Sequence, residues 1–164
     1  MGPSTLGLLA CLVLAPLAAN GQADPCTSGW LSYNGYCYGY FEQEISWQQA
    51  EGFCQSHGGH LASIQSRDEH LAVANFLTKS QWWEHEDVWI GLSISSSAQG
   101  WAWSDGSPMA YTSWEKHYRR AWKNCATLDD SQGFMLWDDD SCSDRNPFVC
   151  KSLAAAPPPQ GAQP

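Results

Sequence analysis

The chain has 164 residues, the length of a single domain, and a formal charge of −9 that arises from 17 acidic and 8 basic residues. Aromatic residues make up 13% of the chain, which is too many for a disordered protein. The acidic balance argues against nucleic acid as a partner, because a phosphate backbone would repel this surface, and it favours calcium, cationic partners and mineral surfaces.

An apolar run from Leu6 to Leu17 lies near the beginning of the chain and is too short to span a bilayer. The segment Gly21-Gln22-Ala23 follows it and provides the small side chains that a signal peptidase needs. We therefore expect a signal peptide over residues 1–23 and a secreted, extracellular protein that has no membrane span. No other long apolar run occurs in the sequence.

The number of cysteines indicates a disulfide-bonded protein from an oxidising compartment. Of the 7 cysteines, Cys11 lies in the expected signal peptide, so an even number remains for pairing within the mature chain. Spacing alone does not choose among the many pairings that these cysteines allow. A zinc site is disfavoured because no Cys-x-x-Cys occurs.

Two amphipathic helices are predicted in the first half of the chain. Ser46-Trp47-Gln48-Gln49 is a capping box at the start of a helix that should end near Gly58-Gly59. Ser66-Arg67-Asp68-Glu69 is a second capping box, which is followed at helical spacing by Leu71, Ala74 and Leu77. Each helix has one apolar stripe and should therefore lie on a core.

Short runs with the composition of strands make up most of the remaining chain. They are Tyr36–Phe41, Val88–Leu92, Trp101–Trp103, Ala126–Leu128, Phe134–Trp137 and Phe148–Cys150. The stretch between Ser104 and Asn124 has little regular pattern, and a long loop in a compact domain is usually functional. These elements predict one α+β domain over residues 24–151, followed by a flexible Ala/Pro-rich tail over residues 152–164.

Several independent motifs, in one order along the chain, resemble the C-type lectin-like domain. They are Tyr36-Cys37-Tyr38, Ser46-Trp47-x-x-Ala50-x-x-x-Cys54, Gly59–Ile64, Trp89-Ile90-Gly91-Leu92, Trp101-x-Trp103-Ser104-Asp105-Gly106, Trp137–Cys142 and Phe148-Val149-Cys150. The resemblance covers nearly all of residues 26–151. It implies the C-type lectin-like fold, in which two helices pack on small antiparallel sheets with a long loop.

The resemblance also implies how the cysteines pair. In the long form of this family the three disulfides would be Cys26–Cys37, Cys54–Cys150 and Cys125–Cys142. Within the family, the chain looks most similar to the avian eggshell-matrix group and next to the pancreatic stone and regenerating-protein group. The family is not known for catalysis, and no nucleophile motif occurs in the sequence, so we expect the protein not to be an enzyme.

The resemblance to the eggshell-matrix group implies an extracellular matrix protein that binds calcium carbonate mineral and modulates its crystallisation. A rigid array of carboxylates could contact many lattice calcium ions at once and gain affinity by multivalency. The candidate mineral-binding residues stand in three acidic groups, namely Glu84, Glu86 and Asp87, then Asp129 and Asp130, then Asp138, Asp139 and Asp140. Taken singly, each group could instead be a solvated surface.

Sugar-binding members of the family hold calcium between a Glu-Pro-Asn or Gln-Pro-Asp segment in the long loop and a later Trp-Asn-Asp. This chain has neither loop tripeptide, and only the second segment remains, as Trp137-Asp138-Asp139. Because calcium takes about six to eight oxygen ligands, Asp138 and Asp139 form an incomplete remnant of a metal site. We therefore expect no required cofactor; calcium stays an option although its usual site is incomplete. The aspartates could instead pair with basic residues of the loop.

The alternative function is a secreted glycan-binding lectin, with antimicrobial activity as one option, that lacks the usual calcium–sugar site. Its candidate surface is the basic loop, with the residues Lys116, Tyr118, Arg119, Arg120, Trp122 and Lys123. For the pair Trp82-Trp83 we favour packing in or against the core, because large aromatic side chains mostly bury area. An exposed tryptophan there could contact a sugar or a protein partner.

Overall fold

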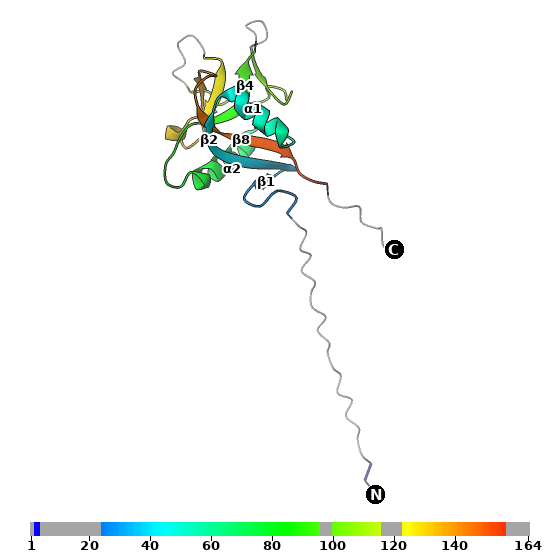
Figure 1. Cartoon of the computed structure of the whole chain (residues 1–164). Helices are drawn as coiled ribbons and strands as arrows, with labels where there is room; N and C mark the ends of the chain where they lie inside the picture. Colours follow the sequence, from blue (N-terminus) through cyan, green and yellow to red (C-terminus); the bar gives the residue numbers. More distant parts are fainter. Residues whose placement is uncertain (1, 4–23, 96–99, 116–122, 157–164) are drawn as a thin grey trace.

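The computed structural model describes residues 2–3, 24–95, 100–115 and 123–156 (Figure 1). The helices are α1 (Trp47–Ser56), α2 (Arg67–Ser80) and a short 3₁₀ helix, η1 (Asp130–Gln132). The strands are β1 (Leu31–Tyr33), β2 (Tyr36–Ile45), β3 (His60–Leu61), β4 (Val88–Ile94), β5 (Trp101–Trp103), β6 (Cys125–Leu128), β7 (Trp137–Asp140) and β8 (Asn146–Leu153). Among the described residues, no helix is both long enough and apolar enough to cross a membrane.

The strands join into one sheet in the order β1-β2-β8-β4-β6-β7, with β3 added beside β8 and β5 beside β4. The pairings among the described strands are antiparallel, except that β4 and β8 meet in parallel at Trp89 and Phe148. The small antiparallel sheets expected from the sequence are thus linked into one sheet by this contact between β4 and β8.

Helix α1 begins where the sequence predicts. The Ser46 side chain accepts a hydrogen bond from the Gln49 N–H, and the Gln49 side chain accepts one from the Ser46 N–H, so the capping box is complete. The helix ends at Ser56, and Gly58 follows with φ +80°, a left-handed conformation that suits glycine.

Helix α2 is also capped as predicted, because the Ser66 side chain accepts from the Glu69 N–H. The second hydrogen bond of this predicted capping box, from the Ser66 N–H to the Glu69 side chain, is replaced by another. The Glu69 carboxylate turns inward and accepts from the Gln65 N–H. The apolar stripe is also shifted, because Leu71 is 45% exposed whereas the neighbouring Val73 is buried together with Ala74 and Leu77. Tertiary contacts of the helix, rather than spacing alone, set which face is buried.

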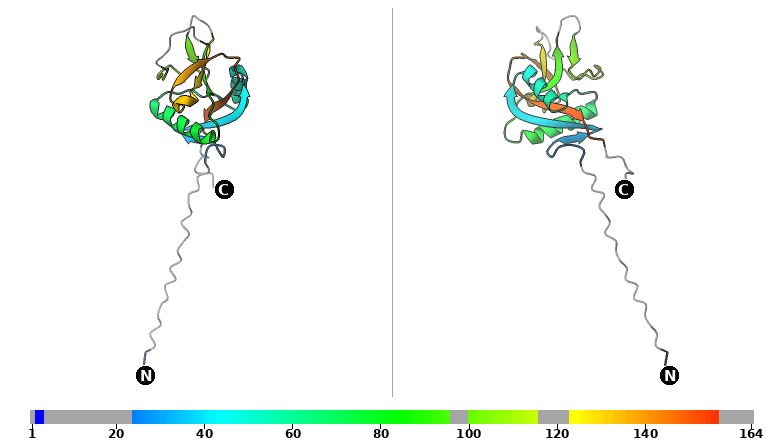
Figure 2. Two further views of the ribbon diagram at one scale, coloured as in Figure 1. Left: turned by 90° about the vertical axis from the view of Figure 1, so that its left-hand side faces the viewer. Right: turned by 45° about the vertical axis from the view of Figure 1, so that its right-hand side comes forward.

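The two helices pack on opposite sides of the β2–β8 pair (Figure 1). Successive side chains of β8 point to opposite sides of the sheet and so enter different cores. Phe148 and Cys150 lie in the core under α1, with Ala50 and Cys54. Val149 lies in the larger core under α2. Figure 2 shows η1, in yellow, beside α2, where the His70 ring nitrogen Nε2 is 2.7 Å from the carbonyl oxygen of Phe134.

The three disulfides implied by the family resemblance are present. Cys26 is bonded to Cys37 across 11 residues, Cys54 to Cys150 across 96 residues, and Cys125 to Cys142 across 17 residues. The Cys54–Cys150 bond joins α1 to β8, and therefore connects the first helix of the domain to its last strand.

Three details of the sequence-based prediction are wrong. The expected strand over Phe134–Trp137 instead begins at Trp137, because Phe134 has φ +62° and its buried ring packs in the core from a turn. Strand β8 continues to Leu153, two residues beyond the expected domain boundary, by pairing with Tyr36. The pair Trp82-Trp83 does not pack in the core, since the two side chains are 77% and 59% exposed.

Candidate functional site

Carboxylates from separate segments meet at one end of β4, β6 and β7. Asp87 directly precedes β4, Asp129 directly follows β6, and Asp138 is the second residue of β7. The antiparallel pairing of β4 with β6 and of β6 with β7 brings these positions together. Glu115 arrives from the segment after β5, where its N–H donates to the carbonyl oxygen of Trp137 at 3.1 Å.

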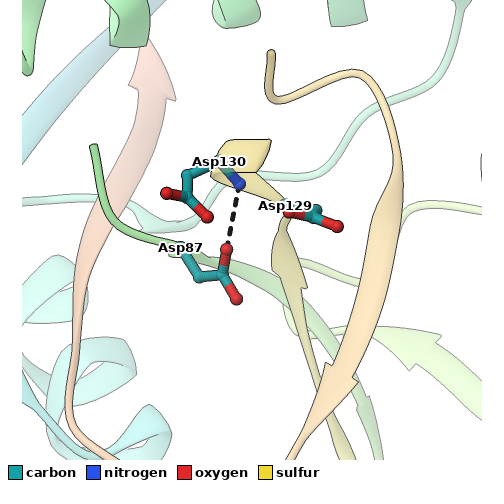
Figure 3. A group of neighbouring side chains, drawn as sticks. All are labelled: Asp87, Asp129 and Asp130. Atoms are coloured by element: carbon teal, nitrogen blue, oxygen red, sulfur yellow. Dashed lines mark hydrogen bonds between the residues drawn. The ribbon is translucent and has the colours of Figure 1, made fainter. Parts of the chain in front are cut away.

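These four carboxylates and that of Asp130 form two overlapping groups. In Asp87–Asp129–Asp130 and in Glu115–Asp129–Asp138, one oxygen from each residue lies within 4.8 Å of the others. Because Asp129 belongs to both groups, the five side chains form one continuous group, the acidic cluster, in which Asp129 is buried and the other four are half-buried. Figure 3 shows its first group, in which the Asp87 carboxylate accepts a hydrogen bond from the Asp130 N–H at 2.9 Å.

The turn between β6 and β7 holds Asp129 in place. Its carboxylate oxygen Oδ1 accepts from the Ser131 N–H at 2.8 Å and from the Ser131 hydroxyl at 2.7 Å, which caps η1. Its own N–H donates to Leu136 and its carbonyl oxygen accepts from Phe134, so the backbone is fixed on both sides. The cluster is therefore built around a rigid central residue.

The carboxyl groups of the cluster perturb one another. Burial, followed by the Asp130 side chain and the charges of Asp130 and Asp129, raises the pKa of Asp87 to about 7. A hydrogen bond to Asp129, with burial, raises the pKa of Glu115 to about 7. Burial raises the pKa of Asp129, but hydrogen bonds from Glu115 and Ser131 outweigh this effect and lower it overall. The cluster thus retains protons near neutral pH, which a divalent cation could replace.

We expect Asp87→Asn to stabilise the protein against urea at pH 8, with a gain that shrinks steadily as the pH falls from 7 towards 4. The folded-state pKa of Asp87 is about 7 against an ordinary 3.8, so the folded state binds more protons than the unfolded state in this range. The wild type therefore loses stability as the pH rises from the ordinary value of 3.8 through the folded-state value of about 7. The side-chain oxygen of asparagine is also an acceptor, so we expect the hydrogen bond from the Asp130 N–H to be kept.

Urea unfolding curves of the variant and the wild type, recorded at several pH values, measure this effect. Glu42→Gln, which removes one exposed carboxylate on β2, is the matched control and should show no comparable pH dependence. A stability difference between Asp87→Asn and wild type that stays constant with pH would show that the carboxyl group titrates normally.

The structure brings only half of the predicted acidic residues into the cluster. Glu84 is exposed on the loop after α2, and the pKa of Glu86 is raised by burial and by Glu44 and Glu84. Asp139 accepts from the Lys123 N–H, and Asp140 accepts from the Asn146 side chain at 3.1 Å. The members predicted from the sequence are thus Asp87, Asp129, Asp130 and Asp138.

Asp138 and Asp139, the remnant of the usual calcium–sugar site, make separate contacts in the structure. Asp138 and Asp139 are adjacent on β7, so their side chains lie on opposite faces of the sheet. Asp138 joins the acidic cluster, whereas the Asp139 carboxylate accepts a hydrogen bond from the Lys123 N–H. The Lys123 ammonium lies 3.8 Å from Asp140, and a cation in this position opposes a calcium ion.

Most of the predicted glycan-binding residues lie outside the described residues. These are Lys116, Tyr118, Arg119, Arg120 and Trp122. Lys123 is described, and it contacts the aspartates of β7 rather than extending away from them. This contact agrees with the expectation that basic residues near the loop could pair with the aspartate triplet.

Glu115 is a member of the site that the sequence does not predict. It stands alone between Trp114 and the basic loop, so no local run of acids identifies it. Its place depends on the parallel bridge between Trp114 and Trp137, which brings it beside Asp138. A contact of this kind between distant segments leaves no signal in the spacing of residues.

Comparisons with known proteins identify the relatives of this chain. Residues 43–152 match the family model described as the lectin C-type domain. Dromaiocalcin-1 from Dromaius novaehollandiae is 46% identical, over 86% of this chain and 100% of that protein. Rheacalcin-1 from Rhea americana is also 46% identical, over 81% of this chain and 99% of that protein.

Two solved structures have the same fold. Human lithostathine superposes with a TM-score of 0.74 at 34% identity, over 78% of this chain and 99% of that chain. Ovocleidin-17, described as a major protein of the Gallus gallus eggshell calcified layer, superposes with a TM-score of 0.72 at 36% identity. That match covers 79% of this chain and 99% of the other.

Proposed function

Since this chain belongs to the C-type lectin domain family, we propose that it is a secreted extracellular matrix protein that binds calcium carbonate mineral and modulates its crystallisation. The acidic cluster carries the proposal, because it holds five carboxylates together at one end of a disulfide-bonded sheet. The presence of its relative ovocleidin-17 in an eggshell calcified layer supports mineral as the partner. In this proposal residues 1–23 are a signal peptide.

The acidic cluster suits a surface with many calcium ions better than a single calcium ion in solution. One carboxylate–calcium contact in water is weak, but several contacts made at once by a rigid array reinforce one another. The cluster is rigid because Asp129 is fixed by Ser131 and because the Cys125–Cys142 bond joins β6 to the segment after β7. Lattice calcium would also displace the protons that Asp87 and Glu115 retain near neutral pH.

A calcite-powder pull-down of residues 24–164 at pH 8 and physiological salt tests the proposal. The variant Asp87→Asn/Glu115→Gln/Asp130→Asn removes three charges from the cluster and leaves Asp129 in place to cap η1. We expect its affinity for calcite to fall about tenfold or more, because a multivalent contact loses several of its bonds together.

The matched control is Asp24→Asn/Glu42→Gln/Asp68→Asn, which changes the net charge equally at exposed positions outside the cluster. It should bind calcite almost as well as the wild type. Equal losses in the two variants would show that net charge, rather than the cluster, drives adsorption. Circular dichroism and urea unfolding establish that both variants are folded.

A further inference from the structure

Two adjacent tryptophans stand in solvent on the loop that follows α2. Trp82 is 77% and Trp83 is 59% exposed, and their rings meet edge to face with centroids 5.0 Å apart. Exposed indoles next to each other are unusual on a soluble protein, since each could bury a large apolar area. A pair displayed in this way indicates an interaction surface.

The loop that carries the pair has fixed ends. The buried Gln81 side chain accepts from the Glu86 N–H at 2.7 Å and donates to the Glu86 carbonyl oxygen at 3.1 Å. It also lies 3.1 Å from the Tyr40 hydroxyl, which anchors it to β2. The His85 ring lies 6.0 Å from the ring of Phe134. Residues 82–86, the Trp loop, are thus pre-organised, and a partner would lose little affinity to ordering them.

Two carboxylates lie in the same loop as the pair. Glu84 follows Trp83 directly and is exposed, and Glu86 closes the loop. Burial and the carboxylates of Glu44, Glu84 and Asp130 raise the pKa of Glu86, so like charges gather around the end of the loop. A ligand that suits the Trp loop therefore combines a flat face for the indoles with positive charge for the glutamates.

We propose that the Trp loop binds an arginine-rich segment of a partner protein. A guanidinium group is planar and cationic, so it stacks on an indole face and also forms paired hydrogen bonds with a carboxylate. A lysine ammonium would use the charge but stack less well. A neutral sugar would stack on the indoles and donate hydroxyl hydrogen bonds to the glutamates, but it would leave their negative charge without a balancing cation. This surface uses residues outside the acidic cluster and does not depend on mineral binding.

Isothermal titration calorimetry of residues 24–164 with an acetylated and amidated Gly-Arg repeat peptide tests the proposal. We expect this peptide to bind about fivefold more tightly than the Gly-Lys repeat peptide of equal length and charge. Trp82→Ala/Trp83→Ala should weaken binding about tenfold or more. Glu84→Gln/Glu86→Gln should also weaken it and reduce its dependence on salt.

The matched control is Leu71→Ala, which removes an exposed apolar side chain from α2 and should leave the affinity unchanged. Equal affinity of the wild type and the double tryptophan variant would overturn the proposal. Equal binding of the arginine and lysine peptides would also overturn it, because charge alone would then explain the contact. Binding of neutral glycans through the two tryptophans, without affinity for the arginine peptide, would assign the loop to sugars instead.

Discussion

Lys151→Met is expected to lower the free energy of unfolding by about 3–5 kcal/mol, the usual cost of removing one partner from a buried ion pair. Lys151 and Glu69 are both buried, and the ammonium Nζ lies 2.6 Å from the Glu69 oxygen Oε1. Nζ also donates to the carbonyl and hydroxyl oxygens of Ser63, at 3.1 and 3.2 Å. Without the Lys151 ammonium group, the Glu69 carboxylate stays in the core with no cation to balance its charge.

Urea unfolding at neutral pH measures this loss. The matched control is Lys123→Met, which removes an ammonium that is 58% exposed and lies 3.8 Å from Asp140, and which should cost only about 0–1 kcal/mol. The double variant Glu69→Leu/Lys151→Met should recover part of the loss, because it removes the unpaired charge as well. A Lys151→Met variant as stable as the control would show that the ion pair contributes little.

This ion pair is the centre of a buried polar network that the sequence does not reveal. Glu69 also accepts from the Tyr38 hydroxyl at 2.6 Å, and Ser63 donates to Asp105. Burial raises the pKa of Asp105, but hydrogen bonds from Ser63 and Ser107 and the charge of Lys151 outweigh it and lower the pKa. The network thus joins α2, β2 and β8 to the segment after β5.

What the sequence predicts well is local or belongs to the family. The Ser46 and Ser66 caps need only residues three positions away, so both helices start where expected. The family, the fold and the three disulfides follow from motifs and are confirmed. The errors at Leu71 and at Trp82-Trp83 concern burial, which depends on what packs against each residue.

The candidate site shows the same limit. Asp87 and Asp129-Asp130 are visible in the sequence as acids that flank predicted strands, but their meeting depends on the pairing of β4 with β6. The same pattern of acids, with another strand order, would leave them apart. Glu115 and Asp138 meet only because the segment after β5 returns to β7.

Removing the Cys54–Cys150 disulfide is expected to destabilise the protein by about 4–5 kcal/mol, by the chain-entropy estimate for a long loop. The bond spans 96 residues, so breaking it frees most of the domain in the unfolded state. The variant Cys54→Ala/Cys150→Ala tests this, because alanine introduces no buried polar group in place of either sulfur.

The matched control is Cys26→Ala/Cys37→Ala, whose bond spans 11 residues and should be worth about 3 kcal/mol by the same estimate. All four sulfurs belong to buried residues, but Cys54 and Cys150 also lie in the core under α1, so loop length and core packing both predict the larger loss for their variant. Urea midpoints and slopes for both variants, measured with the other disulfides intact, give the comparison. If the two losses are equal, loop length contributes little, and the Cys54–Cys150 bond restricts the unfolded chain less than its separation of 96 residues implies.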